Sequence, residues 1–126
     1  MRFMVIVKAD KTTEAGVLPS AKDIEVMGTF NQELMKAGAF VDAAGLKPSS
    51  AGARIARRGG ALQVTDGPFA ETKELIAGYW IIDVTSKAEA IEWCRRVPFD
   101  YLPHDGRDPE LELRPLFEPG DFDVRA

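Results

Sequence analysis

Short apolar runs separated by turn residues predict six strands along the chain. Phe3 to Val7 is an unbroken apolar run, which is typical of a strand buried on both faces in the middle of a sheet. Phe40 to Leu46 and Gly78 to Thr85 predict two more strands. Leu111 to Phe117 alternates apolar and charged residues and contains Pro115, so we expect a last strand at a sheet edge with one face in water.

Two helices are predicted from apolar residues at helical spacing behind capping residues. Ser20, with Asp23 as a weakened capping box, begins the first helix, and Gly38 ends it. Ser86 and Glu89 form a full capping box for the second, which Pro98 stops. The apolar stripes are Met27, Phe30, Leu34 and Ala37 in the first helix and Ala90, Trp93, Cys94 and Val97 in the second.

One glycine, Gly28, lies inside the first predicted helix. Glycine there costs about 1 kcal/mol relative to alanine, so its presence needs a reason. Close packing of the helix on the sheet is one explanation, and the approach of another group to the helix backbone is the other.

A hairpin and a rigid turn lie between the two halves of this pattern. The runs Ala53 to Arg58 and Ala61 to Thr65 flank Gly59-Gly60, which is a hairpin signal. The second run leads into Asp66-Gly67-Pro68-Phe69. Asp66 can bond its own backbone two residues on, Gly67 permits a positive φ and Pro68 fixes φ, so the bend has a physical cause.

The order β-α-β, hairpin, β-α-β predicts an α+β fold of the ferredoxin-like type, in which two helices cover one face of an antiparallel sheet. The other face needs cover, because Tyr79, Trp80 and their neighbours would leave an apolar patch on a monomer. We therefore expect a homodimer with sheets packed face to face. Residues 1–117 are expected to form one domain and residues 118–126 a polar tail.

Composition narrows the class of protein. The chain has 126 residues, 45% of them hydrophobic, which suits one globular domain. Its net charge of −4 and pI near 5.0 argue against a nucleic-acid binder. A single cysteine, Cys94, excludes an intramolecular disulfide, and no zinc-site spacing occurs. No segment has the length of a signal peptide or a membrane span, so we expect a cytoplasmic protein without metal or cofactor.

The turn after the hairpin is the best candidate for a functional site, because ionisable groups gather there near aromatic residues. Asp66 is the candidate catalytic base, and Lys73 would hold an anionic intermediate. There are structural alternatives. Asp66 could accept a hydrogen bond from the backbone of its own turn, and the charged residues after the turn could form a solvent-exposed segment. Tyr79 would either donate to a ligand or pack at a subunit interface. The candidate substrate-binding residues are Phe69, Glu71, Lys73, Tyr79 and Trp80.

Two further groups of charged residues each have two interpretations. His104, next to Asp105, is either a general acid or base in catalysis or a solvated histidine in a loop. The hairpin contains three arginines, Arg54, Arg57 and Arg58. They either bind an anionic group or are charged residues on an edge strand that faces solvent.

The stretch from Val64 to Glu74, followed by Gly78-Tyr79-Trp80-Ile81-Ile82-Asp83-Val84 and Ala90-Ile91-Glu92-Trp93, resembles the DGPF-domain proteins of the YCII-related superfamily. The resemblance covers about nine-tenths of the chain and implies a dimeric α+β barrel. It also implies a family in which members are often encoded beside extracytoplasmic-function sigma factors. Some relatives have a proposed catalytic pair of histidine and aspartate.

This sequence departs from that pair. The superfamily histidine falls on the first helix, which here contains no histidine and has Gly28 at about that position. The aspartate corresponds to Asp66 or to no residue, and nothing carries over to His104.

Two functions follow as hypotheses. In one, a small metabolite binds in a cleft near the turn from Asp66 to Phe69, with cofactor-free proton transfer or elimination. In the other, the protein is a regulatory or sensor module associated with a sigma factor. Whether the protein is an enzyme stays open.

Overall fold

A four-stranded antiparallel sheet forms the centre of the fold in the computed structural model, which describes residues 1–122. Its strand order is β2-β5-β1-β6, with two crossovers through helices, so the predicted ferredoxin-like α+β plan is confirmed. Pro115 lies on the edge strand β6, as predicted. The strands are β1 (Arg2–Lys8), β2 (Phe40–Gly45), β5 (Ile76–Asp83) and β6 (Leu111–Pro115).

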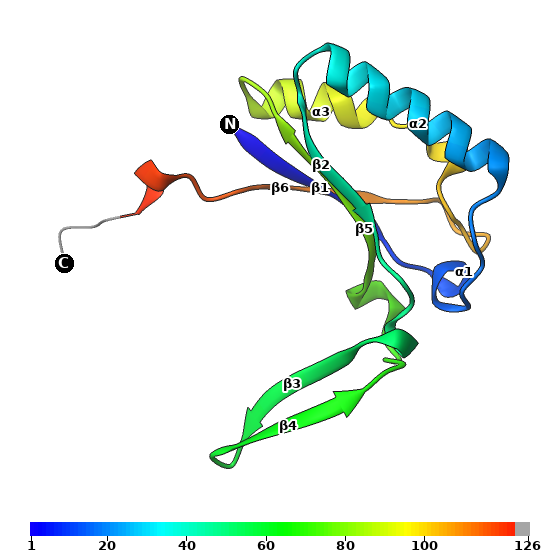
Figure 1. Cartoon of the computed structure of the whole chain (residues 1–126), viewed down its shortest axis with the longest axis vertical. Coiled ribbons are helices and arrows are strands. Elements are labelled where there is room, and N and C mark those ends of the chain that lie inside the picture. The colour runs from blue at the N-terminus through cyan, green and yellow to red at the C-terminus, as the bar shows by residue number, and fades with distance from the viewer. Residues whose placement is uncertain (123–126) are drawn as a thin grey trace.

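The helices α2 (Ala21–Lys36) and α3 (Lys87–Arg95) lie on one face of this sheet (Figure 1). A short helix, α1 (Lys11–Glu14), precedes α2. Asp10 caps α1 by accepting a hydrogen bond from the Thr13 N–H at 2.9 Å. Single 3₁₀ turns occur at Ser49–Ala51, Thr72–Glu74, Phe99–Tyr101 and Pro119–Asp121. No helix within residues 1–122 is both long and apolar enough to cross a membrane.

Capping side chains set where the two main helices begin. The Ser20 hydroxyl accepts from the Asp23 N–H at 3.1 Å, and the Ser20 N–H donates to the Asp23 carboxylate at 2.9 Å. Ser86 caps α3 in the same way, but the Glu89 carboxylate turns to the N–H and hydroxyl of Thr85. These two donors lower the pKa of Glu89. The predicted box at α3 is therefore only half formed.

Side chains from β1, β5, α2 and α3 make one core. Phe30 of α2 is at its centre, with its ring centroid 5.5 Å from that of Trp80 and 6.2 Å from that of Trp93, both edge to face. Leu34 is completely buried. Cys94 packs against this cluster, and burial raises the pKa of its thiol, which favours the inert protonated form. The apolar stripes predicted for the helices thus supply the core, except for the exposed Ala37.

No helix among residues 1–122 covers the opposite face of the sheet. Because side chains alternate along strands, Met4, Ile6, Tyr79 and Ile81 point away from α2 and α3. They form cross-strand pairs, Met4 with Ile81 and Ile6 with Tyr79, and all four are only partly buried. We call these four residues the open face. The central strand β1 is therefore fully buried on one face only, which corrects the prediction of two buried faces within one chain.

The strands β3 (Ala53–Arg58) and β4 (Ala61–Asp66) pair only with each other. The predicted hairpin is confirmed: Gly59 and Gly60 both have positive φ, at 59° and 82°, as the tight turn requires. The hairpin projects from one end of the sheet, and Figure 1 shows it clear of the helices. All but one of its twelve strand residues are exposed.

The core predicts how two neighbouring substitutions on α2 differ. Leu34→Ala should lower the free energy of unfolding by about 2–5 kcal/mol, because it leaves a cavity at a position with no solvent exposure. Met35→Ala, one residue further on and 54% exposed, is the control and should cost less than about 1 kcal/mol. Urea denaturation of both variants measures the difference. Equal losses would contradict the assignment of Leu34 to the core.

Candidate functional site

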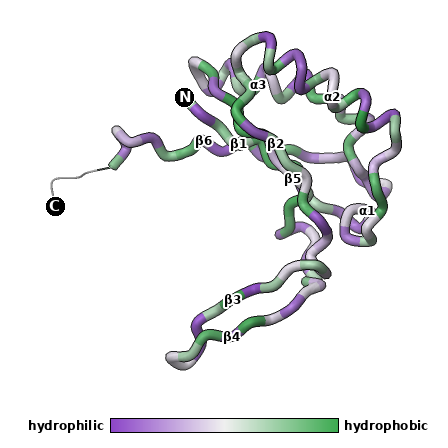
Figure 2. Tube along the Cα trace, in the orientation of Figure 1, coloured by the Kyte–Doolittle hydropathy of each residue, from purple (hydrophilic) through white to green (hydrophobic). Residues whose placement is uncertain are grey.

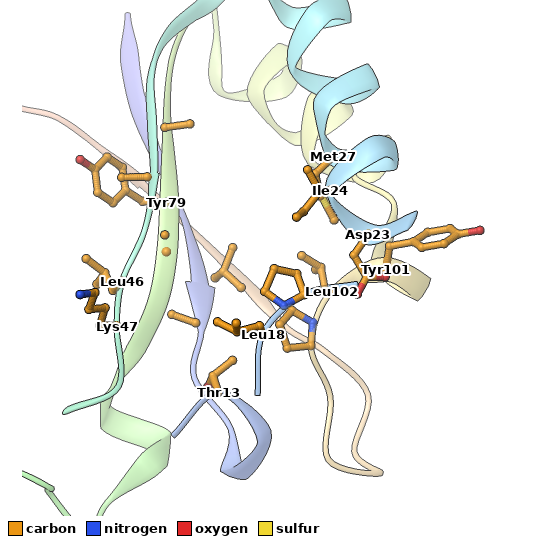
Figure 3. Close-up of a pocket in the computed structure, with 18 of the residues that line it drawn as sticks. Thr13, Leu18, Asp23, Ile24, Met27, Leu46, Lys47, Tyr79, Tyr101 and Leu102 are labelled. Carbon is orange, nitrogen blue, oxygen red and sulfur yellow. The ribbon is translucent and has the colours of Figure 1, made fainter. Parts of the chain in front are cut away.

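A cavity of about 650 Å³ lies between α2, the loop that precedes it and the β2–β5 edge of the sheet (Figure 3). Its wall is mainly apolar. Leu18, Ile24 and Met27 line it from the side of α2, while Trp80 and Leu102 line it from the sheet and the loop after α3. Leu18 and Ile24 are well exposed to solvent, so the cavity is an open cleft rather than a closed void.

Several polar side chains of the wall already have partners. The Trp80 indole N–H donates to the Asn31 side-chain oxygen at 2.7 Å. Asp23 accepts from the Ser20 N–H as part of the α2 cap, and Thr13 bonds with the backbone of Asp10. These polar groups are engaged in holding the wall. Most of the remaining lining is apolar, and Lys47 and Tyr101 also belong to it.

Four wall positions carry no side chain, Gly16, Gly28, Gly45 and Gly78. Gly28 lies on α2, and a Cβ built there would meet nothing within 4 Å, so close packing on the sheet does not explain this glycine. Gly45 and Gly78 are cross-strand partners on β2 and β5. A Cβ at Gly78 would lie 2.8 Å from the Ala44 carbonyl oxygen, so this glycine permits the two strands to approach. Gly28 leaves part of the cleft empty, which favours the other explanation given for it, the approach of another group to the helix backbone.

The structure brings two of the predicted site residues to this cavity, Trp80 and Tyr79. Trp80 contributes its side chain from the helix-facing side of β5. Tyr79 belongs to the open face, and Figure 3 shows its ring pointing away from α2, so only its backbone borders the cavity. Its hydroxyl donates to the Asp42 carboxylate at 3.4 Å.

The other predicted site residues lie outside the cavity wall, at the base of the hairpin or just after it. Asp66 is the exposed last residue of β4, opposite Ala53 of β3. The remaining three, Phe69, Glu71 and Lys73, follow in the turn and the 3₁₀ segment after it. The turn and the cavity are thus separate places in the fold, and the catalytic role of Asp66 stays a prediction.

The turn anchors the hairpin by close backbone contact. The Gly67 N–H donates to the Gly52 carbonyl at 3.0 Å, and a Cβ on Gly67 would lie only 1.8 Å from the Ser49 carbonyl oxygen. Gly67 does not have a positive φ. We expected glycine here for its backbone freedom, whereas the structure requires it because two segments touch. The Gly67–Pro68 peptide bond is cis.

Side chains strengthen this anchor from both sides. The Ser49 hydroxyl accepts from the Phe69 N–H at 3.0 Å and donates to the Glu14 carboxylate at 2.5 Å. The Ser49 N–H also donates to Glu14, at 3.0 Å. The guanidinium of Arg54 lies 3.9 Å from the centre of the Phe69 ring, a cation–π contact. Sequence analysis missed Glu14 and Ser49, since these partners are far apart in the chain and match no motif.

The loop after α3 is fastened to α1 through Asp105 and not through the imidazole of His104. Asp105 accepts from the Lys11 N–H at 3.2 Å and from the Arg107 guanidinium at 3.0 Å. Arg107 and the Lys11 N–H hold the pKa of Asp105 well below its usual range. His104 is exposed, and its carbonyl oxygen accepts from the Thr12 hydroxyl at 3.2 Å. The geometry favours the solvated-histidine interpretation.

Two glycine substitutions should have opposite effects. Gly67→Ala should destabilise the protein by about 2 kcal/mol or more, because the new methyl group collides with the Ser49 carbonyl. Gly28→Ala should be neutral or stabilising by up to about 1 kcal/mol, since it adds a better helix former where there is space. Thermal unfolding of both variants is the measurement. A Gly67→Ala protein as stable as the wild type would contradict the described contact.

Comparison with known proteins agrees with the signature in the turn. Residues 1–101 match the model of the YCII-related domain. An uncharacterised protein of Rhizobium meliloti (strain 1021) is 34% identical over 98 residues, which cover 76% of each chain. The matched region includes the hairpin, the anchoring turn and most of the cavity wall, and it ends before Leu102 and β6. The chain belongs to the YCII-related family.

Proposed function

We propose that the protein binds a small, mainly apolar molecule in the cavity between α2 and the β2–β5 edge. The observation that carries this proposal is the cavity itself, whose volume of about 650 Å³ falls in the range of small-molecule sites. A sheet–helix interface that served packing alone would be filled by side chains. Here Gly28 leaves space in the middle of the wall instead.

Binding has more structural support than acid–base chemistry in this cavity. Asp23 and Asn31, two of the polar side chains in the wall, are held in hydrogen bonds within the protein. The histidine implied by the family resemblance is absent from α2, and Gly28 stands at about its position. The elimination chemistry predicted for Asp66 would have to occur at the base of the hairpin, outside this wall.

We also propose that the functional unit is a homodimer joined through the open face. Met4, Ile6, Tyr79 and Ile81 form two adjacent apolar pairs in the middle of the sheet. Charged residues border them on the edge strand β6, where Glu112 bonds to Lys8 and Arg114. An apolar centre with a charged rim is the usual composition of a subunit interface.

A regulatory role beside a sigma factor is the second candidate. The observation that favours it is the exposed hairpin, which offers apolar side chains and arginines to another protein. In that case the partner would bind the hairpin, and the cavity would hold an effector or remain unused.

The cavity proposal is tested with the dye 1-anilinonaphthalene-8-sulfonate, whose fluorescence rises in apolar sites. Gly28→Phe should abolish most of the saturable dye binding, because the ring fills the cavity from α2. Thr29→Phe adds the same ring at the next, exposed residue and should bind dye like the wild type. Equal binding by all three proteins, each shown to be folded by circular dichroism, would contradict the proposal.

Asp66→Asn tests whether the turn belongs to the same site. Because Asp66 lies outside the cavity wall, the variant should bind the dye with the affinity of the wild type. A dye affinity at least tenfold weaker than that of the wild type would instead show that Asp66 belongs to the ligand site, as the sequence predicted.

A further inference from the structure

We propose that the hairpin of residues 53–66 is an arm that packs against a second copy of this chain, and that the turn Asp66–Phe69 fixes the direction in which the arm points. This inference rests on the proposed homodimer and is independent of the cavity. It assigns a role to the exposed hairpin and to the family signature in the turn.

One face of the arm carries three large aliphatic side chains beside Arg57. The register pairs Ile55 with Val64 and Arg57 with Leu62, and alternation places all four side chains on the same face. Ile55, Leu62 and Val64 are 64%, 66% and 67% exposed. Figure 2 shows hydrophobic residues on both strands of the hairpin. The other face carries short or polar side chains, including those of Gln63 and Thr65.

No strand or helix among residues 1–122 covers this face of the arm. A two-stranded hairpin is at best marginally stable in water by itself and needs a third strand or a packed face. Within residues 1–122, neither β3 nor β4 pairs with the main sheet. Three large aliphatic side chains on one face of such a hairpin are therefore best explained by a surface that covers them.

The position of the arm favours a second copy as that surface. The hairpin and the segment after β6 both leave the sheet on the side away from α2 and α3, where the open face lies (Figure 1). Phe117 and Phe122 of this segment are 74% and 57% exposed, and their ring centroids are 5.1 Å apart. A copy packed on the open face would lie between the arm and this aromatic pair. Two-fold symmetry then lets each arm reach the other subunit.

Charge also favours a second copy. The arm carries three arginines and one aspartate, a net charge of +2, whereas the whole chain has −4, so the rest of the chain carries −6. The basic arm of one subunit is attracted by the acidic remainder of another subunit. Two basic arms repel each other. The distribution therefore favours an arm-to-body arrangement over a pairing of two arms.

The anchor at the base of the arm makes the arrangement specific. Gly67 touches the Ser49 carbonyl, Ser49 bonds to both Glu14 and Phe69, and Arg54 at the start of the arm stacks on Phe69. These contacts hold the arm in one direction before a partner arrives, which lowers the entropy cost of association. The signature motif of the family is thus a positioning device for an interface.

The test compares two double variants of β4 by sedimentation velocity over a range of concentrations. Leu62→Asp with Val64→Asp places two carboxylates on the face with the aliphatic side chains and should raise the dimer dissociation constant by about 100-fold or more. Gln63→Asp with Thr65→Asp adds the same charge to the opposite face of the same strand and should change the constant by less than about fivefold. Dye binding in the cavity should be unchanged in both.

Each outcome decides between the proposals. A monomeric wild type would overturn both the dimer and the arm, while the cavity proposal would stand. A dimeric wild type with equal constants for the two double variants would overturn the arm alone. Dimers that persist in all three proteins, combined with capture of a sigma factor by the wild-type hairpin only, would assign the arm to that other partner.

Trypsin supplies a second measurement, independent of whether the variants fold. Cleavage after Arg57 and Arg58 in the wild type should be at least about tenfold slower above the dimer dissociation constant than below it, because the partner subunit covers the arm. Cleavage rates that do not change with protein concentration would overturn the proposal.

Discussion

The structure depends on one constraint: the sheet has apolar side chains on two faces, and the helices among residues 1–122 cover only one of them. Phe30, Leu34 and Trp93 bury the face that carries Trp80. Met4, Ile6, Tyr79 and Ile81 on the other face have no covering layer among residues 1–122. Apolar burial is the main driving force of folding and of most association, so the uncovered face favours a partner. The proposed dimer and the proposed arm both start from this asymmetry.

The two sides of the sheet then have different tasks. The helix side contains the core and the cavity, where Gly28 leaves room for a ligand. The open side, with the hairpin and the aromatic pair after β6, is suited to association. The turn that carries the family signature belongs to the second task, because it joins the hairpin to Ser49 and Glu14. The rigidity of this turn, which suggested an active site, has a structural explanation in its contacts with Ser49.

Much of the fold could be predicted from the sequence because its signals are local. Ser20 and Ser86 mark helix starts, Gly59-Gly60 marks the hairpin, and the apolar runs mark the strands. The short helix α1 was missed, since its only signal is the cap of Asp10 on four residues. The end of β6 is two residues earlier than predicted, at Pro115.

The site was harder to predict because its contacts are distant in the chain. Ser49 meets Phe69 across twenty residues and Glu14 across thirty-five, and no spacing rule reports such pairs. Tyr79 and Trp80 are adjacent, so their side chains lie on opposite faces of β5. The sequence could not show which of the two faces the helices. Composition and motif identified the turn as unusual, whereas only the fold revealed that the cavity lies elsewhere.

The most direct test of the central claim is the mass of the wild-type protein in solution, measured by light scattering at micromolar concentration. If the open face and the arm are completed by a second copy, the mass will be twice the 13.8 kDa of one chain. A mass of 13.8 kDa across the concentration range would show that the uncovered face is stable in water, and would contradict the account.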